Sequence, residues 1–272
     1  MASRPILGPA VPNPSLDRIE GLLIDIDGVL TVSWKPLPGA PEALQSLRAA
    51  GVPFRLMTNT SEITGRELVE KLRSARFDVE PAEIASAAAL TAHYLRATHP
   101  GARCFVLGGA PSREDLASID LVEDNADVVV IGGASWSLAW EDMNRALRMV
   151  LAGADLVGMH STFSWMTDEG MVLDAGVLLL RGLEAATGRT AVVCGKPSPQ
   201  AFEAGLGLLG LPPERVAMIG DDVVTDVLAA QACGLTGVLV RTGKFRPEAL
   251  RDADGRPDLV VDSIADMPAL LR

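Results

Sequence analysis

The chain has 272 residues, and its formal net charge of −11 disfavours nucleic-acid binding, which usually gains affinity from clustered lysine and arginine. No apolar run is long enough to span a bilayer, and the first residues lack the pattern of a secretory signal. The three cysteines, Cys104, Cys194 and Cys233, are odd in number and lie in apolar settings, so we expect unpaired thiols in a cytoplasmic protein. From the charge and the hydropathy we expect that the protein binds neither nucleic acid nor membrane.

The first structured stretch follows a predicted flexible arm over residues 1–17, in which we identify no chemistry. Residues 22–31 read Leu-Leu-Ile-Asp-Ile-Asp-Gly-Val-Leu-Thr, so a buried strand runs into two aspartates, Asp25 and Asp27, on one side of the chain. Two carboxylates so close together are costly unless a cation lies between them or one is protonated. Mg²⁺ prefers oxygen ligands and leaves positions for phosphate oxygens, so the stretch suggests metal-assisted phosphoryl chemistry.

The motif also allows two other interpretations, a calcium loop and a simple turn. A calcium loop needs oxygen ligands at fixed spacing, whereas Gly28 comes too early and Leu30 stands where an oxygen ligand should be. A simple turn fits the motif equally well. The motif alone therefore leaves site and turn open.

A second strand follows at the spacing of a βαβ unit. Apolar residues recur at helical spacing over 42–50, Gly51 is placed to end that helix, and a strand is predicted over 53–57. A strand, a helix and a strand at this spacing imply a parallel sheet.

Polar residues follow this second strand directly. Ligands gather at the carboxyl ends of parallel strands, so Thr58 and Asn59 are placed to meet an anion beside Asp25 and Asp27. They could also simply precede a helix, for which Thr64 to Glu67 supplies a capping box. Both can hold, because a helix start is itself an anion site.

The middle of the chain reads as a second α/β module inserted into the first. After predicted helices over 66–76 and 82–97, two similar segments begin at Cys104 and Val128, each an apolar strand followed by Gly-Gly. Further helices are predicted over 112–118, 141–152 and 175–186, and a strand over 155–159. We place this inserted cap at 86–188 and the core at 18–85 and 189–272.

The core resumes with a short predicted strand over 191–193, followed by Gly-Lys196-Pro. A strand over 215–219 ends in Gly-Asp221-Asp222, with Asp226 a turn further on. The remaining predicted elements are helices over 200–209 and 223–233, a strand over 237–240 and a strand-helix tail over 259–271.

Three strand ends thus carry oxygen ligands, with one lysine between them in sequence. Phosphoryl transfer needs a nucleophile, an acid/base, a metal site and cations for the spreading charge, and this set supplies each of them. The set comprises Asp25, Asp27, Thr58, Asn59, Lys196, Asp221, Asp222 and Asp226.

In the order and spacing of these motifs the chain resembles the haloacid dehalogenase superfamily of phosphatases, in its NagD-type branch with a large inserted cap. The resemblance implies an α/β fold, with a Rossmann-like parallel sheet core and an inserted α/β cap domain. It also implies that Asp25 attacks phosphorus and that Asp27 serves as acid and base. A second carboxylate at i+2 favours phosphate over halide substrates.

The resemblance assigns the other site residues as well. Thr58, Asn59 and Lys196 would bind the phosphoryl group. Mg²⁺ would be held by Asp25, by the backbone carbonyl of Asp27 and by Asp221, with Asp222 and Asp226 in support.

The residues that choose the substrate lie in the cap, where His160, Trp165 and Asp168 are candidates for the pocket. His160 could equally be a packed histidine, and the segment at Asp168 a surface turn. Within the branch, residues 218–227 and 240–246 are most similar to phosphatases of pyrophosphate and phosphoamides, which implies a substrate of that kind. Sugar-phosphate and nucleotide substrates stay open, as does a homodimer through the cap. Thr242-Gly-Lys-Phe245 is no P-loop, because Val238 replaces the first glycine and Phe245 the final Ser or Thr.

Two functions without catalysis would use a similar set of residues. Receiver-type regulators hold an aspartyl-phosphate with paired acids, a threonine and a lysine, and an interaction scaffold could retain the site by descent. Asp27 and the inserted cap both serve turnover, and every catalytic position is present, so we favour the enzyme.

Overall fold

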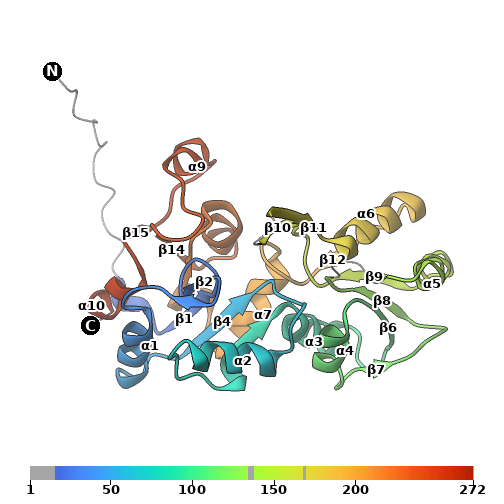
Figure 1. The fold of residues 1–272 in the computed structure, drawn as a ribbon, viewed down its shortest axis with the longest axis horizontal. Helices are drawn as coiled ribbons and strands as arrows, with labels where there is room; N and C mark the ends of the chain where they lie inside the picture. Colours follow the sequence, from blue (N-terminus) through green and yellow to red (C-terminus); the bar gives the residue numbers. More distant parts are fainter. Residues whose placement is uncertain (1–15, 134–137, 168–169, 272) are drawn as a thin grey trace.

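Two parallel sheets, each flanked by helices, lie side by side along the long axis of the molecule (Figure 1). The computed structural model describes residues 16–133, 138–167 and 170–271. In this part of the chain no helix has the length and apolarity that crossing a membrane requires. The α/β fold class predicted from the sequence is confirmed.

The larger sheet has six parallel strands in the order β15-β14-β13-β1-β4-β5, so β1 lies in its interior, between β13 and β4. Both faces of β1 are buried: Leu22 and Ile24 pack into one hydrophobic cluster and Leu23 into another. This double burial explains the unbroken apolar run before Asp25. The strands are β1 (Gly21–Asp25), β4 (Phe54–Thr58), β5 (Ile84–Ser86), β13 (Val216–Gly220), β14 (Thr236–Val240) and β15 (Leu259–Val261).

Helices cover both faces of this sheet, and their ends follow from local sequence. The predicted capping box at Thr64 and Glu67 begins α2, and Gly51, which follows the C-cap Ala50 of α1, takes the expected left-handed conformation. The helices of this part are α1 (Ala40–Ala49), α2 (Gly65–Ser74), α3 (Ala87–Thr98), α7 (Pro199–Leu209), α8 (Ala229–Ala232), α9 (Pro247–Asp252) and α10 (Met267–Leu270).

The second sheet belongs to residues 103–193, here called the cap module. Its parallel strands, in the order β12-β9-β8-β6-β7, are β6 (Arg103–Leu107), β7 (Asp120–Leu121), β8 (Val128–Ile131), β9 (Asp155–Gly158) and β12 (Val192–Val193). Its helices are α4 (Ala110–Asp115), α5 (Trp140–Leu151) and α6 (Ala175–Thr187).

Two sequence predictions are wrong at the borders of the modules. Residues 191–193 were expected to return to the core, but β12 pairs with β9 of the cap module. The alanine-rich stretch 82–97 is not one helix: residues 84–86 form β5 on the edge of the large sheet. Ser86 then caps α3 through its Oγ, which accepts from Ala89 N at 3.2 Å. We therefore propose that the inserted cap extends through Val193.

Two hairpins and one helix, α9, were not foreseen. One hairpin joins β2 (Thr31–Val32) and β3 (Lys35–Pro36), and the other joins β10 (Ser164–Thr167) and β11 (Gly170–Leu173). Their strands are too short to show an alternation of apolar and polar residues in sequence.

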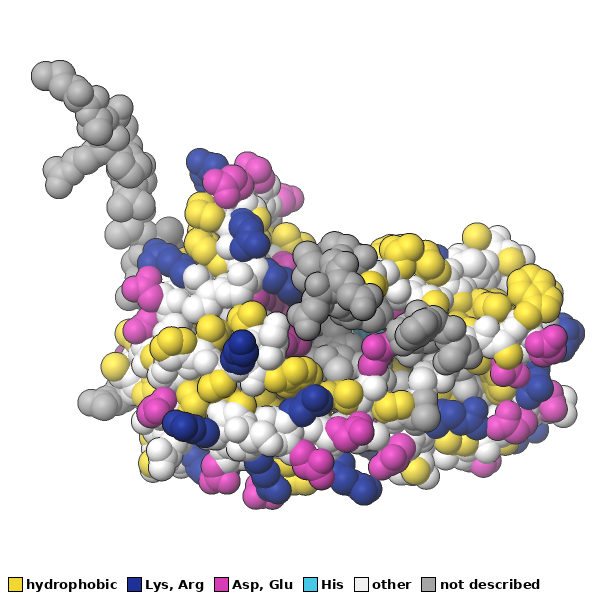
Figure 2. All heavy atoms as spheres, viewed as in Figure 1, with side chains coloured by type: hydrophobic (Ala, Val, Ile, Leu, Met, Phe, Trp, Pro, Cys, Tyr) yellow, Lys and Arg dark blue, Asp and Glu magenta, His cyan; other side chains and the backbone are white. Residues whose placement is uncertain are grey.

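Exposed apolar side chains lie on and beside α6 (Figure 2). Phe163, Leu173 and Leu178 are 47%, 60% and 45% exposed. On the same face, basic and acidic side chains alternate along the molecule. Pairing of two copies through the cap module stays a prediction.

Candidate active site

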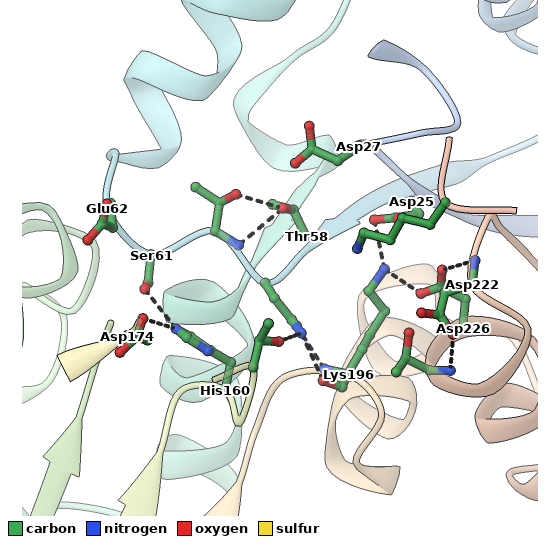
Figure 3. A pocket seen from close by; sticks show the side chains of 15 residues that line it. Asp25, Asp27, Thr58, Ser61, Glu62, His160, Asp174, Lys196, Asp222 and Asp226 are labelled. Atoms are coloured by element: carbon green, nitrogen blue, oxygen red, sulfur yellow. Dashed lines mark hydrogen bonds and ion pairs between the residues drawn. The ribbon is translucent and has the colours of Figure 1, made fainter. Parts of the chain in front are cut away.

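The polar residues predicted at the strand ends come together at one edge of the large sheet. Asp25 is the last residue of β1, Thr58 is the last residue of the neighbouring β4, and Asp221 directly follows β13 on the other side. Because these strands are parallel and adjacent, their carboxyl ends meet. Asp25 and Thr58, together with Lys196 and Asp226, form one wall of a cavity of about 300 Å³ (Figure 3).

Lys196 lies at the centre of this wall. Its Nζ is 2.7 Å from Asp25 Oδ1 and 2.7 Å from Asp226 Oδ1, and its side chain is only 5% exposed. Burial alone would lower the pKa of Lys196, but Asp226 and Asp25 outweigh burial and hold that pKa above its ordinary value. The lysine therefore stays charged and offsets two carboxylates.

Asn59 holds the backbone of Lys196 in place. Its Oδ1 accepts from Lys196 N at 2.9 Å, and its Nδ2 donates to Lys196 O at 2.8 Å. A weaker contact of 3.4 Å joins Nδ2 to Thr162 Oγ1 in the cap module. The predicted contact of Asn59 with phosphate stays a prediction, and the geometry adds a positioning role.

Three carboxylates at this edge of the sheet could hold a cation. Asp25, Asp221 and Asp226 each offer an oxygen, and these oxygens lie within 4.8 Å of one another. Burial raises the pKa of all three, to about 6 for Asp221 and Asp226. Asp221 Oδ1 is buried and has no hydrogen-bond partner in the described part of the chain. An all-oxygen set with one orphaned oxygen fits a hard divalent cation.

Asp226 reaches the site because the helix after β13 is not regular. Residues 223–228 form a π-helical turn, in which Val227 N bonds to Asp222 O. π-Helical turns are frequent at functional sites. The side chain of Asp27, by contrast, is partly exposed and lies outside the carboxylate cluster, and its metal contact through the backbone carbonyl stays a prediction.

A cradle of two glycines holds Asp221. Gly28 and Gly243 have φ of +87° and +58°, and a Cβ on either would overlap the Asp221 carboxylate. The other Asp221 oxygen, Oδ2, accepts from Lys244 N at 2.6 Å. The carboxylate therefore has one fixed orientation.

We expect Gly243→Ala to weaken Mg²⁺ binding by roughly 10- to 100-fold, because the new methyl group displaces Asp221. Calorimetric titration of the metal-free protein with MgCl₂ measures this. Gly188→Ala is the matched control: its φ is +68° but nothing lies within 4 Å of the added Cβ. An equal loss in both variants would assign the effect to backbone strain and contradict the prediction.

On the cap side of the cavity lie His160, Ser61 and Asp174. His160 Nε2 is 3.3 Å from Ser61 Oγ and 3.5 Å from Asp174 Oδ2. His160 is 6% exposed, and burial lowers its pKa more than Asp174 raises it. Of the other cap candidates, Asp168 and the side chain of Trp165 lie outside the described residues.

Comparisons with known proteins agree with this geometry. A model of haloacid dehalogenase-like hydrolases matches residues 22–122, and a HAD-hydrolase-like model matches residues 193–267. Over 262 residues the chain is 35% identical to the phospholysine phosphohistidine inorganic pyrophosphate phosphatase of Rattus norvegicus, covering 94% of this chain and 95% of that protein. The chain belongs to the haloacid dehalogenase-like hydrolases.

Other relatives of this haloacid dehalogenase-like hydrolase point the same way. It is 34% identical to the haloacid dehalogenase-like hydrolase domain-containing protein 2 of Homo sapiens, over 90% of this chain and 93% of that protein. Among solved structures it is similar to the 4-nitrophenylphosphatase of Thermotoga maritima, with a TM-score of 0.86 and 30% identity. The match covers 95% of this chain and 100% of that chain. It is also similar to NagD from E. coli K-12, with a TM-score of 0.83 and 30% identity, covering 91% of this chain and 98% of that chain. The predicted family and enzyme class are confirmed: the chain is a phosphatase.

Sequence reasoning missed several residues of this hydrolase that line the cavity. Lys244 belongs to the segment 240–246 that carries the family resemblance and to a failed P-loop pattern, but it was not predicted as a cavity residue, although it directly follows the glycine that cradles Asp221. Asp174 caps α6, accepting from Val177 N at 2.8 Å, which hides it among ordinary helix starts. The others are Thr60, Ser61, Glu62, Thr162 and Thr225.

Proposed function

We propose that this phosphatase hydrolyses small phosphorylated molecules with Mg²⁺, through a phosphoryl group carried on Asp25. The contact of Lys196 with both Asp25 and Asp226, beside the orphaned oxygen of Asp221, carries this proposal. An anionic nucleophile approaches an anionic phosphate only where positive charge offsets the repulsion. Mg²⁺ held by Asp25, Asp221 and the carbonyl of Asp27 would supply such charge.

In the first step a carboxylate oxygen of Asp25 attacks phosphorus as the bond from phosphorus to the leaving group breaks. Asp27 donates a proton to the departing atom. In the second step water attacks the phosphoryl group, Asp27 accepts a proton from that water, and the bond from phosphorus to Asp25 breaks. Phosphate leaves and both aspartates return to their starting states.

The surroundings of Asp27 suit this exchange of protons. Although Asp27 is partly exposed, it lines the cavity, where partial desolvation raises its pKa, while Lys244 and Lys196 partly oppose the shift. A general acid works best when its pKa lies closer to the working pH.

Two features support finer parts of the proposal. The named activity of the rat relative supports a pyrophosphate or phosphoamide substrate, with a sugar phosphate or nucleotide as the alternative.

Cys104, Cys194 and Cys233 are free, and burial raises the pKa of Cys104 to about 11 and of Cys194 to about 12. Thiols stay unpaired in a reducing cytoplasm, so these three free cysteines support a cytoplasmic location.

We expect phosphate release from a panel of phosphate monoesters, pyrophosphate and a phosphoamide in Mg²⁺, and its loss in EDTA. Colorimetric phosphate assay measures both, and excess Mg²⁺ should restore release. Release that persists in EDTA after dialysis would contradict the metal requirement. A phosphorylated protein stable for minutes, without turnover, would instead favour the regulator.

A further inference from the structure

The segment Thr242-Gly243-Lys244, which fails the P-loop pattern, is attached to the active site. It follows β14, which is parallel to β13, so it lies at the same edge of the large sheet as the site. Thr242 Oγ1 donates to Gly28 O, and a Cβ on Gly243 would overlap the Cα of Gly28. Lys244 N donates to Asp221 Oδ2 at 2.6 Å. The segment is therefore fixed against the residue that directly follows the proposed general acid.

Lys244 differs from Lys196 in what its side chain binds. Both residues line the cavity, and no other lysine or arginine does so among the described residues. Lys196 is buried, and its Nζ lies 2.7 Å from a carboxylate oxygen of Asp25 and of Asp226. Lys244 is exposed, and no carboxylate in the described part of the chain forms an ion pair with it. Its ammonium group is thus a positive charge that a ligand in the cavity can reach.

The charge of Lys244 acts on Asp27, which also lines the cavity. Burial raises the pKa of Asp27, and of the two lysines that oppose this shift Lys244 has the larger effect. The effect of a charge weakens with distance, so this order agrees with an ammonium group on the same side of the cavity as Asp27.

This side of the cavity is where the leaving group departs. In the proposed chemistry Asp27 protonates the departing atom, so the two must lie within hydrogen-bond reach of each other. A positive charge beside Asp27 is therefore also beside the leaving group.

We propose that Lys244 is a specificity-determining residue that favours leaving groups with a negative charge, such as the second phosphate of pyrophosphate. The proposal rests on the proposed phosphatase chemistry and names its substrate class: phosphates with an anionic leaving group. The amine that departs from a phosphoamide is neutral or cationic and gains nothing from a neighbouring ammonium group. The substrate should therefore resemble pyrophosphate rather than a phosphoamide.

The cleavage of pyrophosphate illustrates the role of this lysine. A carboxylate oxygen of Asp25 forms a bond to one phosphorus, and the bond from that phosphorus to the bridging oxygen breaks. The electron pair of the broken bond stays with the departing phosphate, whose bridging oxygen receives a proton from Asp27. The other oxygens of that phosphate keep their negative charge, which the ammonium group of Lys244 offsets before and after the bridge breaks.

Two phosphate monoesters of equal length isolate the effect of this charge. The leaving groups of phosphoglycolate and 2-hydroxyethyl phosphate each have two carbons and end in a carboxylate and a hydroxyl, respectively. We expect the kcat/KM of the wild-type protein to be about 10-fold higher for phosphoglycolate, because a hydrogen bond between charged groups is gained. Phosphate release is measured at pH 7.5 and at a constant concentration of free Mg²⁺.

Variants assign the preference to Lys244. Lys244→Met removes the charge and keeps the backbone N–H that binds Asp221. The ratio of kcat/KM for phosphoglycolate to that for 2-hydroxyethyl phosphate should fall by about 10-fold, and kcat/KM for pyrophosphate should fall with it. Lys244→Arg keeps the charge and should keep the ratio within about 2-fold.

Lys35→Met, on the exposed strand β3, is the matched control. It removes the same charge away from the cavity and should leave the ratio unchanged. Because the ratio is taken within each variant, a change in Mg²⁺ binding or in the folded fraction acts on both substrates and cancels.

The outcomes separate this inference from the proposed function. No release from any of these compounds, nor from 4-nitrophenyl phosphate, would overturn the phosphatase chemistry itself. Release without a preference for phosphoglycolate in the wild-type protein would overturn the substrate class and leave the chemistry standing. A preference that survives Lys244→Met, or that falls equally in Lys35→Met, would overturn the assignment to Lys244.

Discussion

Replacing Asp25 with asparagine should lower kcat by at least ~10³-fold, because an amide oxygen is a poor nucleophile toward phosphorus. The change is nearly isosteric, and Lys196 keeps its contact with Asp226, so the fold should persist. Burial already raises the pKa of Asp25, which means that the charged form is costly in the metal-free protein. Steady-state phosphate release and a thermal melt together test this.

Asp262→Asn is the matched control for this substitution. Asp262 is 81% exposed and pairs with Arg241 away from the cavity, so its loss should leave turnover within about 2-fold. If Asp25→Asn retained more than a tenth of the wild-type kcat, Asp25 would not be the nucleophile. Trapping of phosphate on the wild-type protein by acid quench, absent in Asp25→Asn, adds a direct readout.

Replacing Lys196 with methionine should have the second-largest effect, lowering kcat/KM by roughly 10³-fold and destabilising the protein. The loss leaves two buried carboxylates without their cation, and breaking a buried pair costs about 3–5 kcal/mol. Lysine lowers the pKa of Asp25 and Asp226, so both values rise further without it. Lys35→Met, on the exposed strand β3, is the control.

The pH dependence of this second variant has a definite sign. A carboxyl group whose folded-state pKa is raised contributes stability below its unfolded pKa near 4, and that stability is lost as pH rises through the folded pKa. Asp226 already has a pKa of about 6 with the lysine present. The melting temperature of metal-free Lys196→Met should therefore fall more at pH 7.5 than at pH 5, relative to wild type. An equal fall at both values would contradict this.

The core of the site could be predicted because its residues follow local patterns. Asp25, Thr58 and Asp221 each stand at the end of an apolar strand, and the parallel order of such strands brings their ends together. Asp226 was expected only in support, since its place beside Lys196 depends on a π-helical turn that apolar spacing does not reveal.

The cap side of the cavity could not be predicted in the same way. His160 was a pocket candidate in the sequence and does line the cavity, but its contacts with Ser61 and Asp174 join three separate segments that no spacing relates. The short strand β12 was assigned to the wrong sheet because two residues are too few to show a periodic spacing of apolar side chains. These features depend on tertiary packing rather than on local pattern.

The place of β1 inside the large sheet has a consequence during synthesis. Its partner β4 follows closely, but its other partner, β13, begins only at Val216, after the entire cap. At about 5–20 residues per second, a ribosome needs on the order of 10 to 40 s to reach it. Throughout that interval the apolar edge of β1, from Leu22 to Ile24, has no neighbour on one side. The nascent chain is thus most vulnerable to aggregation while its inserted module is being made, and chaperones should engage it then.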